Sequence, residues 1–320
     1  MIPSFSHRRL DDLPFFGLAA ALIFGLVIPS WFVPYYSWTS ILLQFIFFTS
    51  GLKIDLHSVL SELRDRKLFV VVASLRLVIF PIFVLVLTTW LSPGLVAPLV
   101  LLAAMPAGMT SPLFVDMIRG NVPLALLLTA GTSLLSVVTL PLILGSLNNG
   151  VVTYAPWTMF QSLFFVMAVP IALAQLVRFF SFGREIIRWG GGVMRAGSVL
   201  SLWLLVAAIA SRNSESLKEG FSGSVAIEAF AVMTVLFVLF HGLAYVACFW
   251  RSKKDRITVT LALSYMNFTL AIFLAETLFR DTAAILVVIL SMLPWNMGLL
   301  VFQWLIRHNH WTIEEIHEQK

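Results

Sequence analysis

The sequence has little charge and almost no cysteine. Of its 320 residues, 12% are charged and 59% are hydrophobic, whereas a soluble domain is usually about one-quarter charged and about half apolar. The composition therefore excludes a soluble domain with a single anchor and indicates a polytopic membrane protein. The only cysteine, Cys248, excludes an internal disulfide.

Motifs for catalysis are also missing. The sequence has no H-E-x-x-H pair, no paired aspartate motif and no nucleophile flanked by a base. We therefore predict that the chain is not an enzyme and has no catalytic residues, no cofactor and no bound metal. The net charge of +5 reflects where the basic residues lie relative to the membrane, and it predicts no nucleic-acid partner.

Long apolar runs divide the chain into membrane spans. A helix needs roughly 20 apolar residues to cross a bilayer, and on that measure we predict an all-α protein with ten spans. The predicted spans are 13–32, 36–54, 68–91, 96–118, 122–147, 157–177, 196–212, 224–250, 257–279 and 281–306.

The basic residues predict which side of the membrane each loop faces. With both termini in the cytoplasm, most of the 21 Lys and Arg residues fall in inner loops, as the positive-inside rule requires. Arg212, Lys218 and Arg280 fall in outer loops, and Arg76 lies within the third span. We therefore expect a multi-pass protein of the cytoplasmic membrane.

An odd number of spans in each half predicts an inverted repeat. Residues 1–150 hold five spans and residues 151–320 hold five more, so the second half starts on the opposite side of the bilayer. In such repeats, discontinuous helices build substrate sites near the membrane midplane. We therefore expect two halves integrated into a single membrane domain.

Helix breakers and hydroxyls interrupt the fourth span in "AAMPAGMTSPLFVD" (103–116). Pro106 and Gly108 disturb a first half-helix, and Ser111 as N-cap with Pro112 at the first helical position starts a second. Unwound backbone at this depth is tolerated where it is buried in protein or lines a wet cavity. The pattern predicts a binding site, and a proline kink for packing is the alternative.

The equivalent ninth span carries a polar patch, "SYMNFT" (264–269), between apolar arms. No proline or glycine marks a break there. From its place in the repeat, we nevertheless expect a discontinuous ninth helix that crosses the fourth at the midplane.

The sequence resembles the bile acid/sodium symporter family, which shares a ten-helix inverted-repeat fold. Its "PAGMTSP" (106–112) and "RGN" (119–121) match the family's P-G-G-T-A-S-N and R-G-N with the same spacing. "FFTSGLKID" (47–55) resembles the end of the family's second span. The resemblance implies a secondary transporter with a panel bundle, a core bundle and two sodium sites.

The sodium ligands of that family are only partly present in the first site. Ser111 and Thr129 keep two of its ligands. Pro112 replaces its asparagine, and Ala125 replaces its serine. Ala262 replaces the glutamate that both sites share.

The second site has changed further. Asn267 keeps the family's ninth-span asparagine, Met266 replaces a glutamine, and the third-span glutamine falls on Arg76. Hard cations prefer several oxygen ligands, carboxylates included. We therefore hypothesise that Arg76 is a fixed charge in place of the second sodium and that the first site is weak or absent.

Three ionisable residues inside the spans allow two interpretations each. Arg76 either pairs with an anionic substrate or forms a structural salt bridge. Asp116 either couples transport to protons as the acid linked to the motif or is solvated at the cytoplasmic mouth. His241 either hydrogen-bonds a neighbouring helix or couples transport to protons, because histidine titrates nearest neutral pH.

We predict a secondary active transporter that moves a small organic anion by alternating access, without sodium coupling. Thr110, Ser111, Thr129 and Asn267 would bind the substrate or ion, and Arg76 would add charge. The alternatives are a sodium-coupled organic anion symporter of the bile-acid type and a membrane sensor or scaffold that moves no solute.

Overall fold

The computed structural model describes six segments of the chain, in which every regular element is a helix. The segments are 13–55, 66–87, 90–147, 155–221, 224–279 and 282–308. The expectation that both termini are cytoplasmic concerns residues 1–12 and 309–320, which lie outside these segments, as does Arg280.

The first half of the chain forms short and long helices. They are α2 (Leu13–Val27), α3 (Pro29–Phe32), the 3-10 helix η1 (Val33–Trp38), α4 (Thr39–Lys53), α6 (Arg66–Ser74), the π-helical turn η2 (Leu75–Ile79), α7 (Phe80–Leu87), α8 (Pro93–Ala104), α9 (Ser111–Met117) and α10 (Val122–Gly145).

The second half repeats this mixture. Its helices are α11 (Pro156–Leu163), the π-helical turn η4 (Phe164–Ala168), α12 (Val169–Phe179), α13 (Ser181–Arg212), α14 (Ser214–Phe221), α15 (Ser224–Ala247), α16 (Lys253–Ser264), α17 (Phe268–Leu278) and α18 (Thr282–His308).

Five helices in the described segments are long and apolar enough to cross a membrane. They are Arg66–Leu87, Val122–Gly145, Pro156–Phe179, Trp189–Arg212 and Ala226–Ala247. A pair bent by 109°, Gly17–Val27 with Pro29–Lys53, brings the number to six if the pair counts as one span. The fourth and ninth predicted spans are each split into two short helices. The chain is an all-α polytopic membrane protein.

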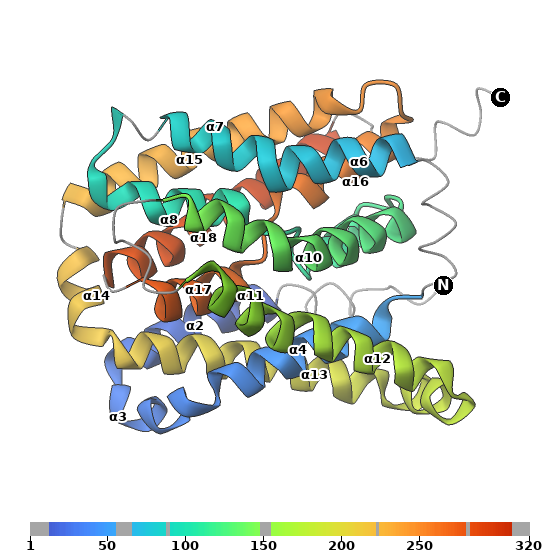
Figure 1. Ribbon diagram of the computed structural model, residues 1–320, viewed down its shortest axis with the longest axis horizontal. Helices are drawn as coiled ribbons and strands as arrows, with labels where there is room; N and C mark the ends of the chain where they lie inside the picture. Colours follow the sequence, from blue (N-terminus) through green and yellow to red (C-terminus); the bar gives the residue numbers. More distant parts are fainter. Residues whose placement is uncertain are drawn as a thin grey trace.

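The helices form two bundles, which lie one above the other in Figure 1. The panel bundle consists of α2, α3, η1, α4, α12 and α13. The core bundle consists of α6 to α10, with η2, and α15 to α18. At the left of the view, α14 packs against both α2 of the panel and α18 of the core. Each bundle takes helices from both halves of the chain.

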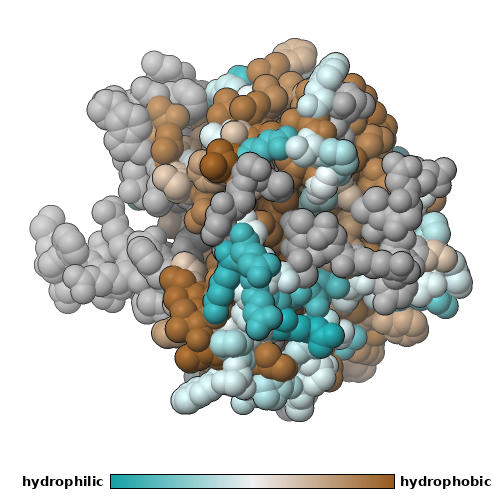
Figure 2. Space-filling model, turned by 90° about the vertical axis from the view of Figure 1, so that its left-hand side faces the viewer, coloured by the Kyte–Doolittle hydropathy of each residue, from teal (hydrophilic) through white to brown (hydrophobic). Residues whose placement is uncertain are grey.

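Apolar side chains cover the flanks of the bundles. Four apolar residues within helices are each more than half exposed: Ile82, Leu142, Leu173 and Val238. Such a surface suits contact with lipid, because water-soluble proteins rarely expose large apolar patches. Hydrophilic residues gather instead near the middle of the end that carries α14 (Figure 2). That helix contains Glu215 and Lys218, so polar surface caps one end of an apolar body.

Candidate functional site

The fourth predicted span is interrupted at its proline and glycine. Helix α8 ends at Ala104 and α9 begins at Ser111, so Pro106 and Gly108 both lie in the break. The chain leaves α8 in an extended conformation and returns through a turn in which the Ser111 amide donates to the Gly108 carbonyl at 3.0 Å. The predicted discontinuous helix is therefore present.

The start of α9 differs from the prediction by one residue. Its N-cap is Thr110, because the Thr110 carbonyl accepts the Leu113 amide at 3.0 Å and the Phe114 amide at 3.1 Å. The prediction of Ser111 as N-cap is wrong: Ser111 is the first helical residue and Pro112 the second. The buried Ser111 hydroxyl instead lies 3.5 Å from the Tyr265 carbonyl oxygen.

The ninth predicted span is also interrupted, without proline or glycine. Helix α16 ends at Ser264 and α17 begins at Phe268. Asn267 is the N-cap of α17, and its Oδ1 accepts the Leu270 amide at 3.1 Å. Asparagine is among the preferred N-cap residues, so its side chain starts the second half-helix.

The two breaks pair with each other through their backbones. The Gly108 amide donates to the Tyr265 carbonyl at 2.7 Å, and the Asn267 amide donates to the Pro106 carbonyl at 3.0 Å. Between these bonds, Ala107 and Met266 form an isolated antiparallel β-bridge. Each break thus satisfies polar backbone groups of the other, which is required at membrane depth.

Gly108 permits this close approach. A Cβ atom at this position would lie 2.8 Å from the Met266 carbonyl oxygen and 3.2 Å from its carbonyl carbon. Both atoms belong to backbone that is already hydrogen-bonded in the crossing, and it cannot move aside as a flexible side chain can.

Helix α10 supports the crossing from the side. The Thr132 hydroxyl accepts the Ala107 amide at 3.1 Å and donates to the Leu128 carbonyl at 2.6 Å. Thr129 and Ser133 flank Thr132 and are buried. Neither of their hydroxyls has a hydrogen-bond partner in the described segments, so buried polar groups remain available beside the crossing.

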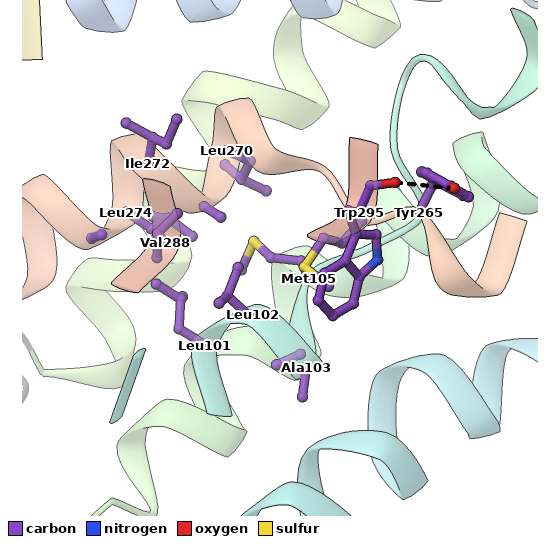
Figure 3. Close-up of a cluster of buried hydrophobic side chains, with 14 of the residues drawn as sticks. Leu101, Leu102, Ala103, Met105, Tyr265, Leu270, Ile272, Leu274, Val288 and Trp295 are labelled. Atoms are coloured by element: carbon purple, nitrogen blue, oxygen red, sulfur yellow. Dashed lines mark hydrogen bonds between the residues drawn. The ribbon is translucent and has the colours of Figure 1, made fainter. Parts of the chain in front are cut away.

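Two aromatic residues that the sequence analysis did not single out hold the second break. The buried Trp295 indole of α18 donates to the Ser264 carbonyl at 2.5 Å, and the Tyr265 hydroxyl donates to the Trp295 carbonyl at 3.3 Å. Figure 3 shows the second bond at one end of a buried apolar cluster that α8, α17 and α18 share. No local pattern marks these residues, because their partners are 30 and 31 positions away.

A pocket of about 80 Å³ opens where the crossing faces the panel bundle. Leu18 and Leu202 line it from the panel, and the core contributes residues from both breaks. The core residues are Gly108, Met109, Thr110, Leu113, Phe114, Tyr265, Met266, Asn267, Phe268, Thr269, Ile272 and Met292. Of the predicted binding residues, Thr110 and Asn267 thus line the pocket, whereas Ser111, Thr129 and Arg76 do not.

Arg76 lies in the π-helical turn η2 and is completely buried. Its three guanidinium nitrogens have no hydrogen-bond partner among the residues that the structure describes. The turn η2 packs against α8 and α10, the two helices that hold the first break and its support. An unpaired buried charge is costly, and π-helical turns are frequent at functional sites.

The other two ionisable candidates do not line the pocket. Asp116 is exposed on α9, consistent with a solvated carboxylate. His241 Nδ1 lies 2.8 Å from the Phe237 carbonyl oxygen, so this hydrogen bond stays within its own helix and does not reach a neighbouring one. Its ring packs edge-on against Tyr265, with centroids 5.5 Å apart.

The residues at the crossing do not fit the sodium sites of the resembled family. Ala125 and Ala262 are buried and supply no side-chain oxygen. Arg76 is a cation, and the Asn267 Nδ2 atom is a buried donor with no acceptor within the described part of the chain.

A second set of contacts clamps the "RGN" turn between α9 and α10. Asn121 is the N-cap of α10, and its Nδ2 donates to Asp255 Oδ1 at 3.0 Å. The Asn121 amide donates to the Thr258 hydroxyl at 2.9 Å. Asp255 also pairs with Arg251 at 2.8 Å. The clamp holds a turn in which Arg119 has a left-handed φ of 58°, so it ties α9 to the start of α16.

Replacing Asp255 with alanine is expected to destabilise the protein by about 2–3 kcal/mol, because two charge-assisted hydrogen bonds to a buried carboxylate are lost. Thermal unfolding of the purified protein in detergent would measure this. Asp55 is the matched control, since it is about half exposed and lies 3.5 Å from Arg178; Asp55→Ala should cost less than about 1 kcal/mol. Equal effects of the two substitutions would contradict the clamp.

Comparison with known proteins agrees with this geometry. The SBF-like CPA transporter family matches residues 15–310, which include both breaks. An uncharacterized protein of Pseudomonas aeruginosa is 25% identical over 285 residues, which cover 82% of this chain and 81% of that protein. The resemblance to bile acid/sodium symporters is thereby confirmed. The chain belongs to the SBF-like CPA transporter family, whose members are membrane transporters.

Proposed function

We propose that this chain is a secondary transporter, not an enzyme, that moves a small organic anion across the cytoplasmic membrane by alternating access. The observation that carries the proposal is the pocket in which both broken helices of the core face Leu18 and Leu202 of the panel. Movement of one bundle against the other would expose such a pocket to each side in turn.

The positions of the breaks support a ten-helix inverted repeat. They interrupt the fourth and ninth predicted spans, which are equivalent positions in residues 1–150 and 151–320. Both bundles draw helices from both halves, which supports one integrated domain. With the termini in the cytoplasm, α9 and α16 lie in the inner half of the membrane, and α8 and α17 in the outer half.

The chemistry of the pocket favours an anion with an apolar body. None of the described residues that line it is acidic. Asn267 Nδ2, which has no acceptor among the described residues, lies at the N-terminus of α17, where the helix dipole is positive. The buried charge of Arg76, in a turn that packs against α8 and α10, adds to the positive potential. Three methionines in the lining, Met109, Met266 and Met292, would pack adaptably against an apolar group.

Uptake is expected to be unchanged when potassium replaces sodium, because Arg76, Ala125 and Ala262 leave no complete sodium site. A thermal-shift screen of branched and aromatic monocarboxylates would identify a ligand. Its uptake into proteoliposomes would then be measured in sodium and in potassium at equal ionic strength. Uptake that scales with the sodium gradient would support a sodium-coupled symporter instead, and binding without uptake would support a sensor or scaffold.

A further inference from the structure

A cluster of polar side chains joins the two bundles on α17, one helical turn beyond the pocket residue Ile272. Glu276 of α17 accepts a hydrogen bond from the Tyr36 hydroxyl at 2.8 Å and another from Asn213 Nδ2 at 2.8 Å. Arg212 pairs with the same carboxylate at 3.6 Å, and its guanidinium lies 4.1 Å above the Tyr36 ring. We refer to Glu276, Tyr36, Asn213 and Arg212 as the latch.

The latch continues the wall of the pocket. Thr269 and Ile272 line the pocket from α17, and Glu276 follows Ile272 by one turn of the same helix. Residues three, four and seven positions apart share one face of a helix. The α17 face that lines the pocket therefore runs directly into the latch.

The latch connects groups that must separate if the bundles move. Glu276 belongs to the core, whereas Tyr36 in η1 and the end of α13 at Arg212 and Asn213 belong to the panel. The Glu276 side chain is only 9% exposed, so its carboxylate depends on these donors for compensation of its charge.

We propose that the latch is the gate that closes the pocket on the outer side of the membrane. This inference rests on the proposed function, and the positive-inside count assigns α17 and Glu276 to that side. With the latch formed, the outer path to the pocket is closed. Opening this path requires both hydrogen bonds to Glu276 and its ion pair with Arg212 to break together.

Glu228 provides a matched control within the core. Its two carboxylate oxygens accept hydrogen bonds from the Ser92 amide at 3.1 Å and the Ser92 hydroxyl at 2.6 Å. Glu228 in α15 and Ser92 at the start of α8 both belong to the core. Their bonds therefore remain intact when one bundle moves against the other.

The gate is tested by labelling a reporter cysteine in the pocket from outside. The reporter is Thr269→Cys in a Cys248→Ala background, and a membrane-impermeant maleimide is applied to whole cells. Glu276→Gln and Asn213→Ala should each raise the labelling rate about threefold to tenfold, the population shift expected from losing one or two hydrogen bonds. Glu228→Gln should leave the rate unchanged.

The outcomes separate the gate from the transport proposal. A faster labelling rate in the Glu276→Gln single variant supports the gate. A Glu276→Gln, Asn213→Ala double variant also supports it if its labelling rate rises by less than the product of the two single effects. The gate is overturned if the labelling rate is unchanged in both latch variants or if Glu228→Gln raises it equally. It is also overturned if the rate rises only in inside-out vesicles, where the maleimide reaches the cytoplasmic side. Labelling requires no substrate, so its result does not depend on the uptake assay. Failure of the uptake assay would count against the proposed function and would leave the labelling result unchanged.

Discussion

Replacement of Gly108 by alanine is expected to abolish transport and to destabilise the protein by about 1–3 kcal/mol, the usual cost of overpacking a well-packed site. The added methyl group would lie 2.8 Å from the Met266 carbonyl oxygen. Relief of this contact requires the two breaks to move apart. Such movement would lengthen the Gly108–Tyr265 hydrogen bond of 2.7 Å and displace Asn267 in the pocket.

Gly94 is the matched control for this experiment. It lies in α8, the first half of the same interrupted span, and a Cβ atom there would meet nothing within 4 Å. Gly94→Ala should melt at or slightly above the wild-type temperature, because alanine costs less backbone entropy than glycine in a helix. Thermal unfolding and proteoliposome uptake would be compared for both variants. Wild-type behaviour of Gly108→Ala would show that the crossing is not closely packed at this residue.

Replacement of Arg76 by glutamine is expected to reduce anion transport about tenfold without lowering stability, because the buried charge attracts the anion through space although Arg76 does not line the pocket. The guanidinium is completely buried and has no partner in the part of the chain that the structure describes. Its removal therefore breaks no internal salt bridge and eliminates the cost of burying an unpaired charge.

The charge itself is tested by Arg76→Lys. Lysine keeps a positive charge at the same depth, so this variant should retain more transport than Arg76→Gln in the same uptake assay. Thermal unfolding would be measured alongside uptake. A large loss of stability in Arg76→Gln would instead indicate the structural salt bridge that the sequence also allowed.

The sequence predicted the first break better than the second, for a physical reason. Pro106 and Gly108 change the backbone where they stand, so the break at residues 105–110 could be read locally. The exact start of α9 could not be predicted from the local sequence, because Thr110 and Ser111 are both acceptable N-caps and tertiary contacts decide between them. The second break was expected only from symmetry, although Asn267 supplies the N-cap.

The contacts that complete the site join residues far apart in the chain. Trp295 binds the end of α16, and Glu276 meets Tyr36 at a separation of 240 residues. Neither contact has a local sequence signature, and Glu276 alone looks like an ordinary interfacial acid. Arg76 was conspicuous as a basic residue predicted deep inside an apolar span, but that it has no partner among the described residues could be established only from the packing around it.

The mutual pairing of the two breaks also has a consequence for biosynthesis. Ser111 and Tyr265 are 154 residues apart, and chains are synthesised at about 5–20 residues per second. The first break therefore emerges from the ribosome roughly 8–30 seconds before its hydrogen-bonding partner exists. During that interval its unpaired amides and carbonyls have no place in lipid. We expect the nascent fourth span to remain beside the translocon, or in contact with water, until the ninth span arrives.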